Sequence, residues 1–193
     1  MDASQLVAAL APLPRLFEEQ QTLARKGPAE GSMAISDAHI AERHRIWTLA
    51  NQAWLNGTEH VNTWRLLLVG AKFQPAAAHY TLLRGALEGL VTCRWLIDGR
   101  VSASERIARA CAFRLEDLRQ RKNLEHELPD LPAPISPGKT AHERIAELRR
   151  SMAANGIVEV GFPSAVDRFD THGDGAWAYR ILSAYAHSFE PPC

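Results

Sequence analysis

The sequence has no excess of charge of either sign, because its 22 basic and 22 acidic side chains cancel. A chain with this balance creates no global field that attracts nucleic acid or an anionic membrane. Any such partner must therefore be bound through a local site. The basic residues are nevertheless biased, since 18 are arginine and only 4 are lysine. This bias has two interpretations: a GC-rich coding sequence, or planar phosphate recognition by guanidinium groups.

Cysteine is scarce, and long apolar runs are missing. Cys93, Cys111 and Cys193 cannot all pair, and their spacing fits neither a zinc site nor a redox CxxC motif. The first 14 residues lack the basic and apolar regions of a signal peptide, and no run approaches the roughly 18 apolar residues of a membrane span. We therefore expect a cytoplasmic protein with reduced thiols and no membrane partner.

Several enzyme signatures are missing as well. There is no His-x3-His or Glu-x-x-His pair, so a di-iron site in a helical bundle is not expected. There is no glycine-rich phosphate loop and no Gly-x-Ser-x-Gly elbow. Gly85 and Gly89 lie within a helical pattern and are interpreted as sites of close helix packing. We expect no metal and no cofactor.

What the sequence does contain is helical periodicity. The chain is 46% hydrophobic over 193 residues, which is enough for one buried core. We predict an all-α fold, a single-domain bundle of five to six helices, with residues 1–35 as an N-terminal helix and loop and residues 36–193 as the helical domain. The predicted helices span residues 6–26, 36–68, 75–98, 105–127, 141–154 and 176–189.

Three local signals refine these elements. Ser36 or Asp37 is the predicted cap of the second helix, and Asn56 with Gly57 could end it before a continuation. The 11 residues of 128–138 contain four prolines and predict a rigid linker. Residues 157–162 are predicted to be either a short strand or a connector.

Residues 75–98 are apolar nearly all round, so this helix is predicted to be the central, buried one. Arg84 and Glu88 lie four positions apart within it and share one stripe of the helix. One interpretation is a structural salt bridge. The other is that Glu88 reaches the last helix and there orients His187 or pairs with Arg180.

The last predicted helix carries the candidate chemistry. Arg180 and His187 are separated by almost two turns, so their side chains project about 20° apart. Composition alone predicts about two Arg-x(4–6)-His spacings in such a chain. The other two matches both end at His126 in a polar, solvated segment, whereas Arg180 and His187 share an otherwise apolar helix. The pair is either an edge arginine with a helix-terminal histidine, or a phosphate anchor with a general base.

Two segments carry a resemblance to a known superfamily. Residues 179–188, YRILSAYAHS, resemble the terminal-helix signature of HEPN-like domains, which are all-α. Residues 79–88, HYTLLRGALE, and 94–98, RWLID, resemble the central helix of uncharacterised bacterial members. The resemblance follows the order of elements over roughly residues 64–187. It implies a HEPN-like fold and a metal-independent endoribonuclease, often homodimeric, of the kind found in toxin–antitoxin and phage-defence systems.

The resemblance also implies roles for individual side chains. His187 would be the general base or acid, and Arg180 would hold the scissile phosphate. Glu88, the candidate carboxylate partner from the residue pattern, would complete the catalytic set. The remaining candidates would bind substrate: Arg84, Ser183 and Ser188. The implied partners are RNA, a second copy of the chain, and an antitoxin or another protein.

Two rival hypotheses remain open. Ile181 follows the motif arginine, where many catalytic members carry Asn, Asp or His, so a catalytically inactive dimerisation or partner-binding protein of the same fold is the second hypothesis. A small-ligand-binding bundle is the third, because the predicted interior is rich in Trp and Ala. The net-positive stretch 100–122, with seven basic and three acidic residues, is either an RNA-contacting face or a solvated one.

Overall fold

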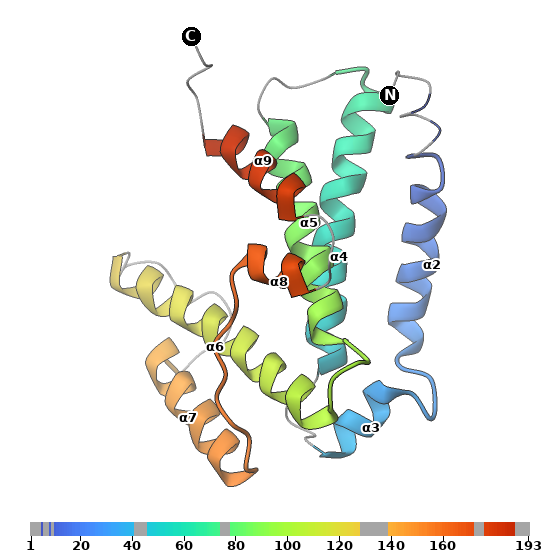
Figure 1. Ribbon diagram of the computed structural model, residues 1–193. Coiled ribbons are helices and arrows are strands. Elements are labelled where there is room, and N and C mark those ends of the chain that lie inside the picture. Colours follow the sequence, from blue (N-terminus) through green and yellow to red (C-terminus); the bar gives the residue numbers. More distant parts are fainter. Residues whose placement is uncertain are drawn as a thin grey trace. The chain divides into compact units, whose positions relative to one another are not determined.

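The computed structural model describes residues 5, 8, 10–40, 46–73, 78–127, 139–171 and 176–187. These residues form helices and no strand, so the all-α prediction is confirmed (Figure 1). The helices are α2 (Leu13–Lys26), α3 (Met33–Ile40), α4 (Ile46–Arg65), the π-helix η1 (Leu66–Gly70), α5 (Ala78–Leu96), α6 (Ala103–Glu127), α7 (Ala141–Ala154), α8 (Ala165–Thr171) and α9 (Ala176–His187).

The chain divides into two compact units that alternate along the sequence. Unit 1 comprises Met1–Ser32, Trp47–Ile97 and Pro163–Cys193, and unit 2 comprises Met33–Ile46 and Asp98–Phe162. Helices α2, α5, α8 and α9 and nearly all of α4 therefore belong to unit 1, whereas α3, α6 and α7 belong to unit 2. The predicted boundary at residue 35 stays a prediction.

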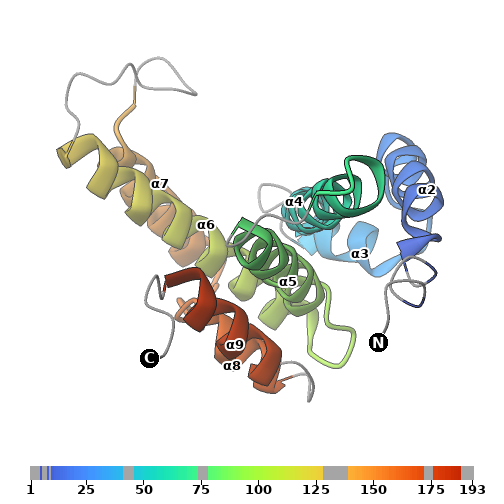
Figure 2. The same ribbon diagram turned by 90° about the horizontal axis from the view of Figure 1, so that it is seen from above.

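Helix α5 is the central helix of unit 1, with α4 on one side and α8 and α9 on the other (Figures 1 and 2). Helices α4 and α5 meet at their glycines. A Cβ atom on Gly89 would lie 2.5 Å from the Gly57 nitrogen and 2.6 Å from the Ala53 oxygen, and one on Gly85 would lie 2.6 Å from the His60 ring. The interpretation of Gly85 and Gly89 as packing sites is confirmed.

This packing also explains why α4 continues past Gly57. The sequence left open whether Asn56 and Gly57 end the helix, and α4 passes through both residues without a break. Because Gly57 has no side chain, α5 can approach α4 closely here. A Cβ added to Gly57 would lie 3.0 Å from Leu90 and from the Ala86 oxygen. Glycine in a helix costs about 1 kcal/mol relative to alanine, and close packing of the two helices offsets that cost.

Helix α6 is the long element of unit 2 and packs against α7 and α3. One apolar face of the helix is buried, at Ile107, Cys111, Leu115 and Leu118. The predicted capping role of Ser36 or Asp37 is wrong, because both residues lie inside α3. Asp37 is buried instead as the partner of Arg106, whose Nε and Nη2 donate to its two carboxylate oxygens at 2.7 and 2.8 Å.

Helix α7 agrees with its predicted bounds because both of its ends carry local signals. Thr140 forms a capping box with Glu143, in which each side chain accepts from the other residue's backbone nitrogen. The helix stops at Asn155, and Gly156 follows with a φ of 64°.

Residues 157–162 form no strand and are a connector. The predicted linker at 128–138 and the helix start at Pro75 lie outside the described residues.

Candidate functional site

Arg180 lies on the outer side of α9 because its neighbour Tyr179 faces inward. Tyr179 is only 8% exposed, whereas the Arg180 side chain is 64% exposed. Successive helical residues point about 100° apart, so burying the tyrosine leaves the arginine in solvent. Its Nη2 lies 3.9 Å from Asp170 Oδ2, and that carboxylate is also largely exposed. An exposed pair at this distance contributes about 0–1 kcal/mol, which leaves the guanidinium charge accessible to an anionic ligand.

His187 is the last residue of α9, so the arginine and the histidine do share one helix. Seven positions, or almost two turns, therefore separate the two residues along α9. Ser183 lies between them on the same helix and is half-buried. Ser188, the remaining predicted residue of this segment, lies outside the described residues.

Glu88 reaches from α5 to α9, where its described partner is Tyr179. The Tyr179 hydroxyl donates a hydrogen bond to Glu88 Oε1, and Arg84 Nε donates to the same oxygen at 3.2 Å. The Arg84 guanidinium carbon also lies 5.7 Å from the centroid of the Tyr179 ring, within cation–π range. The structure thus brings Glu88 and Arg84 together with α9, whereas the ion pair described for Arg180 is made to Asp170.

A cluster of apolar side chains holds Tyr179 in this position. Its ring centroid lies 5.6 Å from that of Phe169, and both residues are buried in a cluster with Val91. Leu87 and Val166 pack against the cluster from α5 and α8. Three helices therefore fix the phenol, and through it the orientation of α9 about its own axis.

Arg168 of α8 adds a buried cation beside Glu88. Its Nη1 donates to the Pro163 carbonyl oxygen, and its side chain is almost fully buried. Desolvation lowers the pKa of Arg168, while the charges of Glu88, Tyr179 and Asp167 act in the opposite direction. Glu88 is therefore the anion in a region with two arginines, Arg84 and Arg168.

Sequence reasoning missed Tyr179 and Arg168. For Tyr179 a signal existed, because a tyrosine on the inner face of a helix needs a partner for its hydroxyl. No pattern around Arg168 marks it, since Glu88 lies far away in sequence and only the packing of α5 against α8 brings the two regions together.

The outer side of α9 also presents apolar surface. Trp177 is 70% exposed and Ile181 is 47% exposed. These residues lie four positions apart and form one stripe next to Arg180. Large exposed apolar side chains that adjoin one another are typical of a contact surface.

Five of the seven basic residues in the stretch 100–122 form ion pairs with carboxylates of the chain. Arg106 binds Asp37, Arg109 lies 2.6 Å from Glu105 and 3.6 Å from Asp98, and Arg100 binds Asp98 at 2.9 Å. Arg119 and Arg121 pair with carboxylates too. These contacts favour the interpretation of a solvated and structural face over that of an RNA-contacting one.

The described residues contain neither a metal-binding cluster nor a membrane-spanning helix. No three His, Cys, Asp or Glu side chains within the described ranges are grouped so as to hold a metal ion. None of the helices described here combines the length and apolar character that crossing a bilayer requires. Comparisons of the chain with protein-family models, with curated proteins and with solved structures found no match.

Proposed function

We propose that the chain is a HEPN-like, metal-independent endoribonuclease in which Arg180 and His187 are the catalytic pair. The observation that carries the proposal is the exposed Arg180 on a helix that its buried neighbour Tyr179 ties to Glu88. An arginine placed this way makes little contribution to stability, and it projects from a helix whose rotation is fixed. Both properties suit a side chain that binds a scissile phosphate.

The proposed chemistry is an intramolecular transesterification at phosphorus. His187 removes the proton from a ribose 2′-hydroxyl, and the 2′-oxygen attacks the adjacent phosphorus. The bond to the 5′-oxygen breaks, this oxygen takes a proton from water, and a 2′,3′-cyclic phosphate remains, while His187 releases its proton to solvent. Arg180 binds the non-bridging oxygens and stabilises the negative charge that develops on them in the transition state. An imidazole titrates near neutral pH, which suits proton transfer in either direction.

Glu88 and Arg84 are proposed to act through Tyr179. The hydrogen bond from Tyr179 to Glu88 fixes the rotation of α9, and Arg84 holds the carboxylate in place. Glu88 is then a positioning residue in this mechanism, and Arg84 supports it. Ser183 and Ser188 stay as predicted substrate-binding groups on the segment that carries the pair.

The experiment is RNA cleavage in the presence of EDTA, together with growth inhibition on expression, for the wild type, Arg180→Ala and His187→Ala. Cleavage should fall by about 10²-fold or more in each variant. Arg15→Ala is the matched control, because Arg15 is also exposed in unit 1 and pairs with Glu19 at 2.7 Å. Equal cleavage by the wild type and all three variants would refute the proposal.

A second candidate is a catalytically inactive protein of the same fold that binds a partner or a second copy. The exposed stripe of Trp177 and Ile181 favours it. Sedimentation equilibrium of the wild type and of Trp177→Ser with Ile181→Ser tests this candidate. Self-association that the double variant abolishes, combined with no cleavage by the wild type, would support the second candidate over the first.

A further inference from the structure

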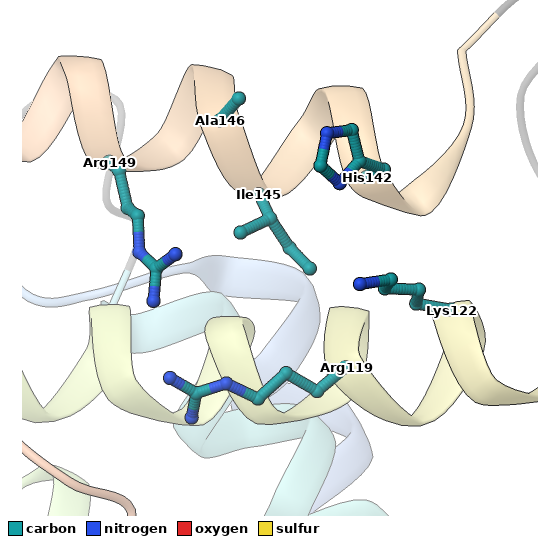
Figure 3. Close-up of a pocket in the computed structure, with 6 residues that line it drawn as sticks. All are labelled: Arg119, Lys122, His142, Ile145, Ala146 and Arg149. Carbon is teal, nitrogen blue, oxygen red and sulfur yellow. The ribbon is translucent and has the colours of Figure 1, made fainter.

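Unit 2 contains a cavity of about 330 Å³ between α6 and α7. Six residues line it: Arg119, Lys122, His142, Ile145, Ala146 and Arg149. Figure 3 shows Arg149 and Ile145 extending from α7 toward α6, with the Lys122 side chain in the space between the two helices. Four of these six residues carry a positive charge or can take one up. The volume of the cavity lies in the range of small-ligand sites, about 300–1,000 Å³.

The two arginines of the cavity already converge on one anion. Glu159, on the connector after α7, accepts from Arg149 Nε at 2.9 Å and Nη2 at 3.0 Å, and from Arg119 Nη2 at 3.2 Å. The hydrogen bond from Arg149 holds the pKa of the Glu159 carboxyl below its usual range. A guanidinium fork that binds a carboxylate in this way also matches the oxygens of a phosphate group.

The cationic side chains that line the cavity outnumber the two carboxylates that pair with its arginines. Arg119, Lys122 and Arg149 supply three positive charges at neutral pH. Against them stand Glu159 and Glu116, whose Oε2 lies 3.6 Å from Arg119 Nη1. A dianion would therefore be attracted more strongly than a neutral molecule.

Other parts of the site restrict the ligand further. The first backbone amide of α7, on Ala141, donates to both oxygens of Glu125 at 3.2 and 3.1 Å. Recognition must therefore come from the side chains rather than from this amide. Ile145 and Ala146 provide an apolar wall next to the charged groups, which suits a ligand that carries an organic group beside its anion.

We propose that this cavity binds a small organic phosphate monoester, with Lys122 and the two arginines as its anchors and with Glu159 as a built-in competitor for the same guanidinium groups. The ligand's phosphate would take the place of the Glu159 carboxylate. This site belongs to unit 2 and does not depend on Arg180 or on RNA cleavage.

Isothermal titration of the whole chain with phenyl phosphate tests the proposal. The wild type should bind it saturably and more tightly than it binds inorganic phosphate, because only the organic ester reaches the apolar wall. Lys122→Gln and Arg149→Gln should weaken binding about tenfold, the loss expected for one hydrogen bond to a charged group. Arg121→Gln is the matched control on α6, because Arg121 pairs with Asp117 at 3.1 Å and does not line the cavity.

Glu159→Gln separates a ligand site from a merely structural ion pair. Removing the competing negative charge should tighten phenyl phosphate binding severalfold, whereas a purely structural role would give no gain. Circular dichroism and the urea midpoint establish that each variant is folded. No saturable binding by the wild type, or no gain in Glu159→Gln when it is folded, would overturn the proposal. RNA cleavage by Lys122→Gln at the wild-type rate would show that the site is separate from the proposed nuclease.

Discussion

Helix α6 of unit 2 and helix α9 of unit 1 both have an apolar face and both carry an arginine. The two arginines differ in how far they are exposed to solvent. The Arg106 side chain is 8% exposed and is bound to a buried carboxylate, whereas that of Arg180 is 64% exposed beside an exposed carboxylate. A buried guanidinium loses its hydration, so it requires a partner and ties two helices together. An exposed guanidinium has no such need. The position of an arginine in its helix thus separates structural arginines from those available for a ligand.

The largest expected effect breaks the buried pair. Asp37→Ala leaves Arg106 buried beside a missing carboxylate, and unfolding free energy should fall by about 3–5 kcal/mol. Urea denaturation of the whole chain measures this loss. Asp117→Ala is the control, because it removes an exposed partner of Arg121 on the same helix and should cost less than about 0.5 kcal/mol. Similar losses in the two variants would contradict the distinction between buried and exposed pairs.

Cysteine alkylation sharpens the comparison of the two units. Burial raises the pKa of Cys93 in unit 1 and of Cys111 in unit 2 to about 11, from 9.0. Near pH 8 the raised pKa should leave about 100-fold less thiolate at each buried cysteine than at an exposed one. Because only the thiolate reacts with iodoacetamide, labelling mapped by mass spectrometry should be slow at both sites until urea is added. Rapid labelling of one site in the folded protein would contradict burial in that unit.

Tyr179→Phe tests the inward half of α9. The change removes the hydroxyl that binds Glu88 and leaves a half-buried carboxylate with one partner fewer, at an expected cost of about 1–2 kcal/mol. Glu88→Gln should cost less, because its amide oxygen can still accept from Tyr179. Thermal unfolding monitored by circular dichroism measures both changes. A Tyr179→Phe variant as stable as the wild type would show that this hydrogen bond does not hold α9.

The smallest expected effect concerns the stability of Arg180→Ala. The side chain is exposed and its ion pair is long, so the free energy of unfolding should change by no more than about 0.5 kcal/mol. Urea denaturation of this variant and of the wild type gives the comparison. A loss near that of Asp37→Ala would mean that Arg180 is a structural residue.

The elements that the sequence predicted well are those defined by nearby residues. Helix α7 follows from Thr140 at one end and Asn155 at the other, because capping acts within one turn. Whether α4 continues through Gly57 could not be decided from the sequence, since it depends on the backbone of α5. Asp37 appeared to be a cap for the same reason: its true partner, Arg106, is 69 residues away.

The same limit applies to the candidate site. The spacing of Arg180 and His187 is a local property, and their common helix was predicted. The contact of Tyr179 with Glu88 joins positions 91 residues apart, so it required the packing of α9 on α5. The cavity between α6 and α7 was not predicted either, because the converging side chains of Arg119 and Arg149 belong to different helices.

The most direct measurement is the rate at which Arg180→Ala cleaves a mixed-sequence single-stranded RNA in EDTA, relative to the wild type. We predict EDTA-resistant cleavage by the wild type and a rate lower by about 100-fold or more in Arg180→Ala, with both proteins unfolding at the same urea concentration. Equal rates in the two proteins, or a folded wild type that cleaves no RNA, would contradict the proposed role of Arg180.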